Sequence, residues 1–115
     1  MMEEEKVLIV EGKSDRKRVE SLLDEPVKII CTYGTLSEEK LENLILPIED
    51  FDVYILVDQD ESGEKLRKQL KRELPNATHL YTEKEYGQVE TTPLDFLASV
   101  LRKSFIIKDV PFLPN

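Results

Sequence analysis

Short apolar runs alternate along the chain with amphipathic stretches, and glycine, proline or serine stands at most of the junctions. The apolar runs are typical of strands buried on both faces, and we predict four of them, over residues 7–10, 27–31, 53–57 and, most weakly, 77–81. The stretches between and after these runs predict four helices, over residues 15–23, from 38 to about 46, from 64 to 74, and from 93 to 101.

Hydroxyl residues and prolines mark where these helices begin and end. We predict Ser14, Ser37 and Thr92 as N-caps, because a side-chain oxygen at that position can accept a hydrogen bond from an N–H of the first turn. Pro47 and Pro75 are expected to end the second and third helices.

The alternation of strands and helices predicts an α/β fold, a four-stranded, mostly parallel sheet flanked by helices. In such sheets ligands bind beyond the carboxyl ends of the strands, at the point where the strand order reverses. If the spatial order is 2-1-3-4, that point lies between the first strand and the third.

Acidic residues follow the first and third predicted strands. Glu11 comes directly after the run 7–10, and Asp58 and Asp60 follow the run 53–57. The predicted topology brings these three carboxylates together, and carboxylate oxygens are ligands that Mg²⁺ prefers. The alternative is that they are solvated loop acids stabilised by the dipole of the next helix.

Length and composition narrow the class of protein. A chain of 115 residues fits one domain, spanning 1–115. The single cysteine, Cys31, excludes an intrachain disulfide and argues against a cysteine-based zinc site. The acidic N-terminus precedes only a four-residue apolar run, so we expect a cytoplasmic protein with no membrane association.

The net charge of −8 argues, on average, against a dedicated nucleic-acid-binding protein. Basic residues nevertheless gather in two short windows that follow the acidic loops: Lys13, Arg16, Lys17 and Arg18, then Lys65, Arg67, Lys68, Lys71 and Arg72. Lys65, Lys68 and Arg72 share one helix face, so we predict that a nucleic-acid backbone contacts this face. The alternative is a solvated face opposite the leucine stripe.

Glycines stand at the turns beside these windows. Gly12 permits a tight turn before Lys13, which can neutralise a phosphate near a helix N-terminus. Gly34 and Gly63 occupy comparable places after the second and third strands, and we include all three glycines among the candidate phosphate-binding residues. Taken one at a time, each has a plainer explanation as a turn residue.

Three segments of the chain carry a family resemblance: "VLIVEGKSD", "CTYGT" and "YILVDQDESGEKLRK". Together they resemble the Toprim domain family, in the version found in the 5S ribosomal RNA maturase. The resemblance implies a Rossmann-like Toprim fold and a site for phosphodiester cleavage or nucleotidyl transfer that depends on Mg²⁺, with Mn²⁺ as an alternative. It makes Glu11 the general acid or base, assisted by Lys13. Asp58 and Asp60, together with Glu11, then form the metal set.

Further residues match the maturase pattern less specifically. Asp15 completes "EGKSD", and Gly63 opens "GEK". Glu90 in "KEYGQVE" matches only loosely. The maturase resemblance favours RNA over DNA as the partner, and a protein partner is expected to supply substrate specificity.

Two other functions remain open. One is a non-catalytic module that binds metal or phosphate, or regulates RNA processing, through the same pocket. The other is a receiver-like domain with Asp58 as phosphoacceptor, which is disfavoured because the first strand ends in one acid rather than a pair. The sequence leaves the oligomeric state open.

His79 and the tyrosines are candidates for chemistry by residue type alone. We predict that His79 is packed in the fourth strand rather than catalytic. The four tyrosines are expected to be core or rim residues, at positions 33, 54, 81 and 86.

Overall fold

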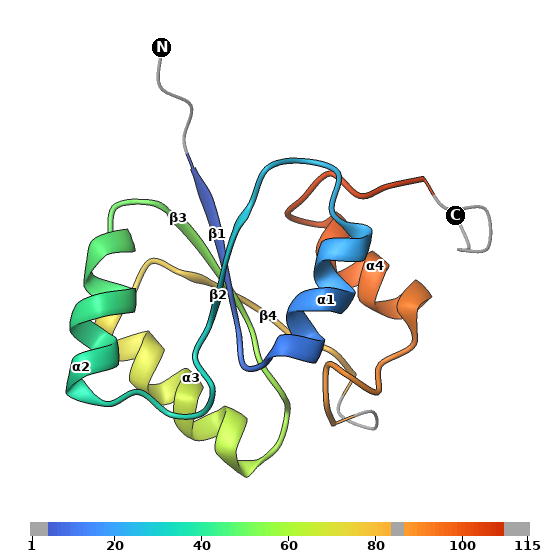
Figure 1. The fold of residues 1–115 in the computed structure, drawn as a ribbon. Helices are drawn as coiled ribbons and strands as arrows, with labels where there is room; N and C mark the ends of the chain where they lie inside the picture. The colour runs from blue at the N-terminus through green and yellow to red at the C-terminus, as the bar shows by residue number, and fades with distance from the viewer. Residues whose placement is uncertain (1–4, 84–86, 110–115) are drawn as a thin grey trace.

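The computed structural model describes residues 5–83 and 87–109. Within this part of the chain, four strands form one sheet in the order β2-β1-β3-β4, and every neighbouring pair is parallel (Figure 1). The predicted α/β class and the 2-1-3-4 order are therefore confirmed. The strands are β1 (Lys6–Val10), β2 (Lys28–Cys31), β3 (Asp52–Leu56) and β4 (Thr78–Leu80).

Helices cover both faces of the sheet (Figure 1). α1 and α4 contribute to the hydrophobic cluster on one face, and α3 packs with the helical segment after β2 on the other. None of the helices in the described ranges has the length and apolar character needed to cross a membrane. Their bounds are α1 (Lys13–Leu22), α2 (Glu38–Lys40), α3 (Glu61–Glu73) and α4 (Leu94–Arg102).

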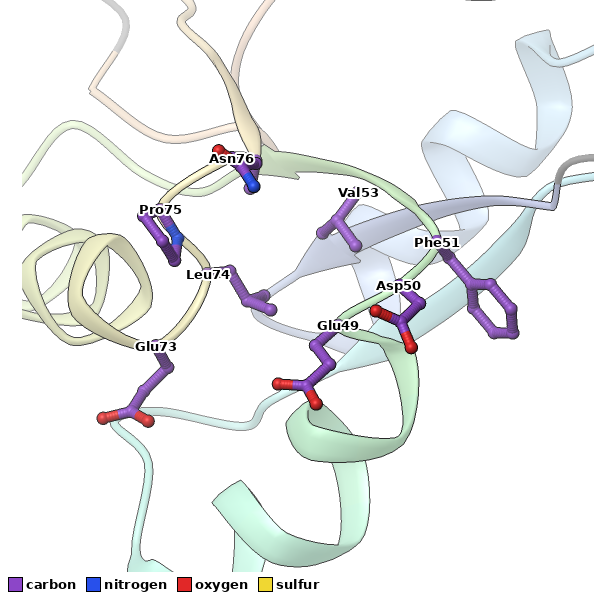
Figure 2. Close-up of a pocket in the computed structure, with 9 residues that line it drawn as sticks. Glu49, Asp50, Phe51, Val53, Glu73, Leu74, Pro75 and Asn76 are labelled. Atoms are coloured by element: carbon purple, nitrogen blue, oxygen red, sulfur yellow. The ribbon is translucent and has the colours of Figure 1, made fainter.

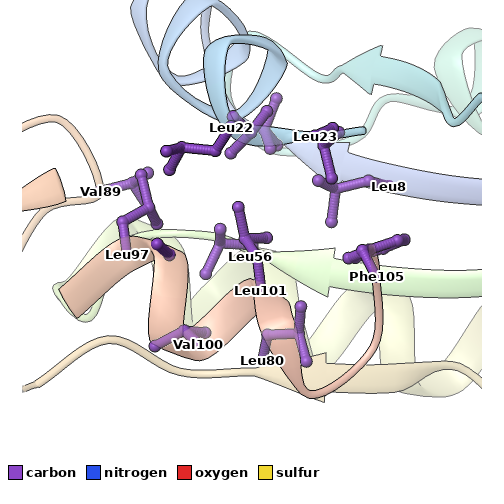
Figure 3. Close-up of a cluster of buried hydrophobic side chains, with 13 residues drawn as sticks. Leu8, Leu22, Leu23, Leu56, Leu80, Val89, Leu97, Val100, Leu101 and Phe105 are labelled. Atoms are coloured by element: carbon purple, nitrogen blue, oxygen red, sulfur yellow. The ribbon is translucent and has the colours of Figure 1, made fainter. Parts of the chain in front are cut away.

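The central strands explain why the apolar runs are continuous. Val7, Leu8, Ile9 and Val10 are all fully buried, with Leu8 and Val10 in one cluster and the other two in the opposite cluster. Figure 3 shows the first cluster, in which Leu8 and Leu56 of the sheet face leucines of α1 and α4. A strand covered on both faces needs no polar face, so its sequence does not alternate between apolar and polar residues as that of a half-exposed strand does.

Two of the three predicted N-caps are wrong. Ser37 caps α2 as expected, accepting a hydrogen bond from the Lys40 N–H at 3.2 Å. α1 begins at Lys13, one residue before Ser14, so Ser14 lies inside the helix. The cap residue is Gly12, which has no side chain to accept a first-turn N–H, and its own N–H donates to the buried Asp15 carboxylate. At α4 the cap residue is Pro93, and the Thr92 hydroxyl donates to the Gln88 carbonyl instead.

Pro47 does not end the second helical segment. After α2 the chain continues through a π-helical turn (Leu41–Ile45) and a 3-10 turn (Leu46–Ile48). Pro47 lies in the first turn of this 3-10 helix. Backbone N–H groups in a first turn make no hydrogen bond within the helix, so a proline, which lacks the N–H, is tolerated there. Pro75 behaves as predicted, because α3 ends at Glu73, just before it.

Candidate functional site

The strand order places Glu11 and Asp58 at adjacent strand ends. β1 and β3 are paired in register, with Ile9 opposite Ile55, and each acid follows shortly after the paired residues. The Glu11 Oε1 atom accepts a hydrogen bond from the Asp58 backbone N–H at 2.7 Å. The structure therefore brings together two acids that lie 47 positions apart in the sequence.

Asp58 and Asp60 each accept a backbone hydrogen bond as well. The Asp58 Oδ1 atom accepts the Val89 N–H at 2.8 Å. The Asp60 Oδ1 atom accepts the Gly63 N–H at 2.8 Å and so caps α3. One oxygen of Asp60 therefore caps the helix, as the alternative interpretation of these acids expected. Among the described residues, the second oxygen of Asp58 and that of Asp60 accept no hydrogen bond.

The segment after β4 holds the acidic loop in place. The Gln59 N–H donates to the Gly87 carbonyl at 2.6 Å, and the Gln59 side-chain amide donates to the Thr82 carbonyl. Gly87 has a φ of 69°, a left-handed conformation that favours glycine. This contribution was not predicted from the sequence, in which "GQVE" matches the maturase pattern only loosely.

Burial and neighbouring negative charges raise the pKa values of the acids. Burial raises the pKa of Glu11 above its ordinary 4.5, and the negative charges of Asp58, Asp60 and Asp15 add to this rise, while the hydrogen bond from the Asp58 N–H opposes it. Burial also raises the pKa of Asp58 above its ordinary 3.8, and the charge of Asp60 adds to it, against the Val89 N–H. A bound cation would relieve this repulsion.

Asp15 and Glu90 belong to the same electrostatic group. Asp15 is buried at the start of α1, and burial raises its pKa, with further upward contributions from Asp58 and Glu90. Glu90 is exposed, and its charge also raises the pKa of Asp58. The loose sequence match at Glu90 therefore falls on a residue that lies near the acids.

The donor set fits a divalent metal with few protein ligands. Within residues 5–83 and 87–109, no three acidic, histidine or cysteine side chains converge as a ready-made metal cluster. Mg²⁺ is commonly held by one or two carboxylates, with waters and substrate phosphates completing its coordination. The second oxygens of Asp58 and Asp60 match that requirement.

The basic candidates are exposed at two places around the acids. Lys13 and Arg16 lie at the start of α1, next to Glu11 in the chain, and Arg16 forms an ion pair with Glu20 at 3.3 Å. Lys65, Lys68 and Arg72 are exposed along α3, the helix that Asp60 caps.

The three candidate glycines differ in their structural roles. Gly34 has a φ of 109°, so its conformation favours glycine, whereas Gly12 is extended, with a φ of −137°. Gly63 is buried against the acidic loop, and a Cβ atom there would lie 1.9 Å from the Asp58 carbonyl oxygen. Gly63 thus allows α3 to start directly against the backbone of Asp58.

We expect Gly63→Ala to destabilise the protein by about 1–3 kcal/mol, because the added methyl group must push α3 away from the Asp58 carbonyl. Ser62→Ala is the matched control, since Ser62 is the preceding residue in the first turn of α3 and is exposed. That control should change the free energy of unfolding by less than about 0.5 kcal/mol. Urea unfolding of both variants measures the difference, and equal effects would contradict this role of Gly63.

Burial and the neighbouring charge of Arg67 keep His79 neutral, because both lower its pKa. Arg67 is 2% exposed and donates to the carbonyls of Val57 at 3.2 Å and Leu80 at 2.7 Å. Its guanidinium also lies 3.0 Å from His79 Nδ1. Burial and then the charge of Arg67 lower the pKa of His79 from 6.5 to about 4. The structure therefore places His79 in a packed, structural setting.

This arrangement predicts a loss of stability in mild acid. In the unfolded chain His79 takes up a proton near pH 6.5, but in the folded protein only near pH 4. Protonation therefore favours the unfolded state as the pH falls from 6.5 to 4, and the free energy of unfolding should drop by about 1–3 kcal/mol after allowance for solvent screening. The raised pKa values of the acids act in the opposite direction, so urea unfolding of wild type and His79→Gln must be compared. The variant should lack this drop, and an unchanged pH profile would contradict the assignment.

A hollow lies at the opposite edge of the sheet, between the start of β3 and the end of α3 (Figure 2). Its lining includes Glu49, Asp50, Phe51 and Glu73. None of the residues predicted for the site lines it. The candidate site is therefore the acidic edge and not this hollow.

Proteins similar to this chain include several ribonucleases. The uncharacterized protein YusF of Bacillus subtilis (strain 168) is 57% identical over 104 residues, which are 90% of this chain and 71% of that protein. Ribonuclease M5 of Fusobacterium nucleatum is 28% identical over 106 residues, 86% of this chain and 58% of the ribonuclease. Ribonuclease M5 of Mycoplasma genitalium is 33% identical over 78 residues, 67% of this chain and 43% of that protein. The chain thus spans about half the length of these ribonucleases.

A solved structure and a family model agree with this similarity. The structure of a small TOPRIM domain protein from Bacillus stearothermophilus superimposes with a TM-score of 0.85 at 48% sequence identity, covering 93% of this chain and 92% of that one. The Toprim domain model matches residues 6–94, which include all four strands together with Glu11, Asp58 and Asp60. The chain therefore belongs to the Toprim domain family.

Proposed function

We propose that this protein cleaves or transfers phosphodiester bonds of nucleic acid with Mg²⁺ or Mn²⁺ at the carboxyl edge of β1 and β3. The observation that carries the proposal is the 2.7 Å contact between Glu11 and the Asp58 N–H. It joins two half-buried acids from different strands. Burial raises the pKa of both, and neighbouring negative charges add to the rise, those of Asp58 and Asp60 at Glu11 and that of Asp60 at Asp58. Family membership and the ribonuclease M5 relatives support the same reaction class.

The acids are proposed to divide the chemistry between metal binding and proton transfer. Asp58 and Asp60 hold the metal through the oxygens not used by Val89 and Gly63. When bound, the metal supplies charge neutralisation and Lewis acidity at a phosphate. Glu11 exchanges a proton with the reacting group or with water, because its raised pKa lies closer to neutral pH than that of an ordinary glutamate.

Basic residues are proposed to bind the nucleic-acid backbone. Lys13 stands at the N-terminus of α1, where an anion is favoured by both the side chain and the helix dipole, and Arg16 lies one turn further along. Lys65, Lys68 and Arg72 extend this basic surface along α3. Such contacts give affinity without sequence preference.

RNA is the proposed nucleic acid, because the named relatives with an assigned activity are ribonucleases. The chain spans about half the length of these relatives, and we propose that a protein partner supplies the substrate specificity. Glu11, Lys13 and the acidic loop would then form the catalytic part of a larger assembly.

The test is a substrate panel. The purified protein is incubated with labelled structured RNA, single-stranded DNA and duplex DNA, each with Mg²⁺, with Mn²⁺ and with a chelator. The proposal expects metal-dependent product from the RNA. Intact substrates in all nine reactions would refute an enzyme that acts without a partner.

One observation favours a non-catalytic module as the second candidate. One carboxylate oxygen of Glu11, the residue proposed to transfer a proton, is already occupied by the Asp58 N–H, whereas Asp58 and Asp60 each keep one oxygen for a metal. Mg²⁺ binding by calorimetry without turnover on any substrate would favour this candidate. The receiver-like alternative is set aside, because the chain belongs to the Toprim domain family.

A further inference from the structure

Two exposed tyrosines flank the acids along the carboxyl edge of the sheet. Tyr81 directly follows β4 and is 48% exposed, and Tyr33 follows β2 after one residue and is 67% exposed. Because the strand order is β2-β1-β3-β4, the edge presents Tyr33, Glu11, Asp58 and Tyr81 in that order. Tyr54, by contrast, packs edge-on against Phe105, and Tyr86 lies outside the described residues.

The spacing suits a short stretch of nucleic acid. Neighbouring strands lie about 4.8 Å apart, so three strand spacings separate Tyr33 from Tyr81 by about 14 Å along the edge. The Glu11–Asp58 pair occupies the middle of this span. A few nucleotides can bridge such a distance with one phosphate at the acids and a base on either side.

Tyr81 is held as a rigid platform. The guanidinium carbon of Arg67 lies 4.1 Å from the centre of the Tyr81 ring, and the His79 ring stacks beside it at 6.4 Å. Arg67 is itself fixed by the carbonyl of Val57, the residue before Asp58. One buried side chain therefore positions both the aromatic ring and the acidic loop, and Tyr81 as a residue remains 48% exposed.

Tyr33 is strained and tied to the site. Its φ of 54° is uncommon for a residue other than glycine. Its backbone N–H donates to the Glu11 carbonyl at 2.7 Å, so the turn that carries the ring is anchored to the acid. A large aromatic residue that is 67% exposed gains little from packing, which leaves its placement in a strained turn unexplained by folding.

We propose that Tyr33 and Tyr81 stack on unpaired nucleobases on either side of the phosphate presented to Glu11 and Asp58. The inference rests on the proposed function and narrows it to a substrate that is single-stranded at the site. Every base has a flat face for an aromatic ring, whereas in a duplex those faces are covered by neighbouring bases. Loss of one stacking contact corresponds to about a 5- to 150-fold rise in Kd.

The test measures binding separately from cleavage. Fluorescence anisotropy at low salt, with a chelator present, follows labelled 12-nucleotide single-stranded RNA, the matching DNA and an RNA duplex. The proteins are wild type, Tyr33→Asn, Tyr81→Leu and the two Tyr→Phe variants. Asparagine tolerates the positive φ of Tyr33, so folding is preserved. Phe51→Leu is the matched control, because Phe51 is also exposed but lies before β3, at the opposite edge.

Stacking predicts that Tyr33→Asn and Tyr81→Leu each raise the single-strand Kd about 5-fold or more, that phenylalanine restores binding, and that Phe51→Leu has no effect. Duplex affinity should change little, and the RNA and DNA arms show whether the sugar matters. Unchanged single-strand affinity, equal loss on the duplex, or no binding by wild type would overturn the inference. Ring-dependent binding by a wild type that never cleaves with Mg²⁺ supports stacking and refutes only the catalytic proposal.

Discussion

Asp58→Asn is expected to abolish Mg²⁺-dependent turnover and to weaken metal binding by at least about 10- to 100-fold, because it replaces a charged oxygen ligand with a neutral amide. The fold should survive, since the asparagine oxygen can still accept the Val89 N–H that Asp58 accepts at 2.8 Å. Removing one charge beside Asp60 also relieves repulsion, so the metal-free variant should be no less stable than wild type. Calorimetric Mg²⁺ titration, thermal melts and cleavage rates measure the three effects.

Asp50→Asn provides the matched control for this variant. Asp50 is exposed and lines the hollow at the opposite edge of the sheet, so its amide should leave both affinity and rate unchanged. Metal affinity and turnover that survive in Asp58→Asn would remove Asp58 from the metal site. Equal losses in both variants would indicate a general charge effect and not a ligand.

Glu11→Gln is expected to lower the cleavage rate by about 100-fold or more while part of the metal affinity remains. Glutamine keeps the size of the side chain, and its amide oxygen can still accept the Asp58 N–H now bound by Glu11 at 2.7 Å. It cannot exchange a proton, so the loss should fall on the chemical step. Single-turnover rates at saturating Mg²⁺ separate this step from binding.

Glu49→Gln, at the opposite edge, is the control for Glu11→Gln and should cleave at the wild-type rate. A Glu11→Gln variant as fast as wild type would refute proton transfer by Glu11. A variant that is slow only because it no longer binds Mg²⁺ would make Glu11 a metal ligand instead.

The fold was predictable from the sequence because the central strands are buried on both faces. The run 7–10 is fully buried, and the run 53–57 is buried apart from the partly buried Tyr54, which explains why both are continuous in the sequence. Helices between parallel strands then limit the topology to a few arrangements. The helix ends were harder, because the residue before the first turn need not carry a hydroxyl. Gly12 stands at the start of α1, with its N–H bound by Asp15, and the Thr92 hydroxyl donates to the Gln88 carbonyl instead of capping α4.

The meeting of Glu11 and Asp58 was predictable for the same reason, since strand order alone places their strand ends side by side. The support from Gly87 and Val89 was not, because it depends on the path of a loop after a three-residue strand. The role of Gly63 was equally hidden. It follows from the distance between α3 and the Asp58 carbonyl, which no local pattern in the sequence encodes.

The most direct measurement of a metal-dependent nuclease site at this edge is a single-turnover reaction started by Mg²⁺. Wild type and Asp58→Asn are each mixed with end-labelled structured RNA in chelator, and excess Mg²⁺ is then added. The proposed function predicts that cleavage begins with Mg²⁺ in wild type alone and stops when chelator is restored. RNA that stays intact with wild type, or that Asp58→Asn cuts at the same rate, would contradict it.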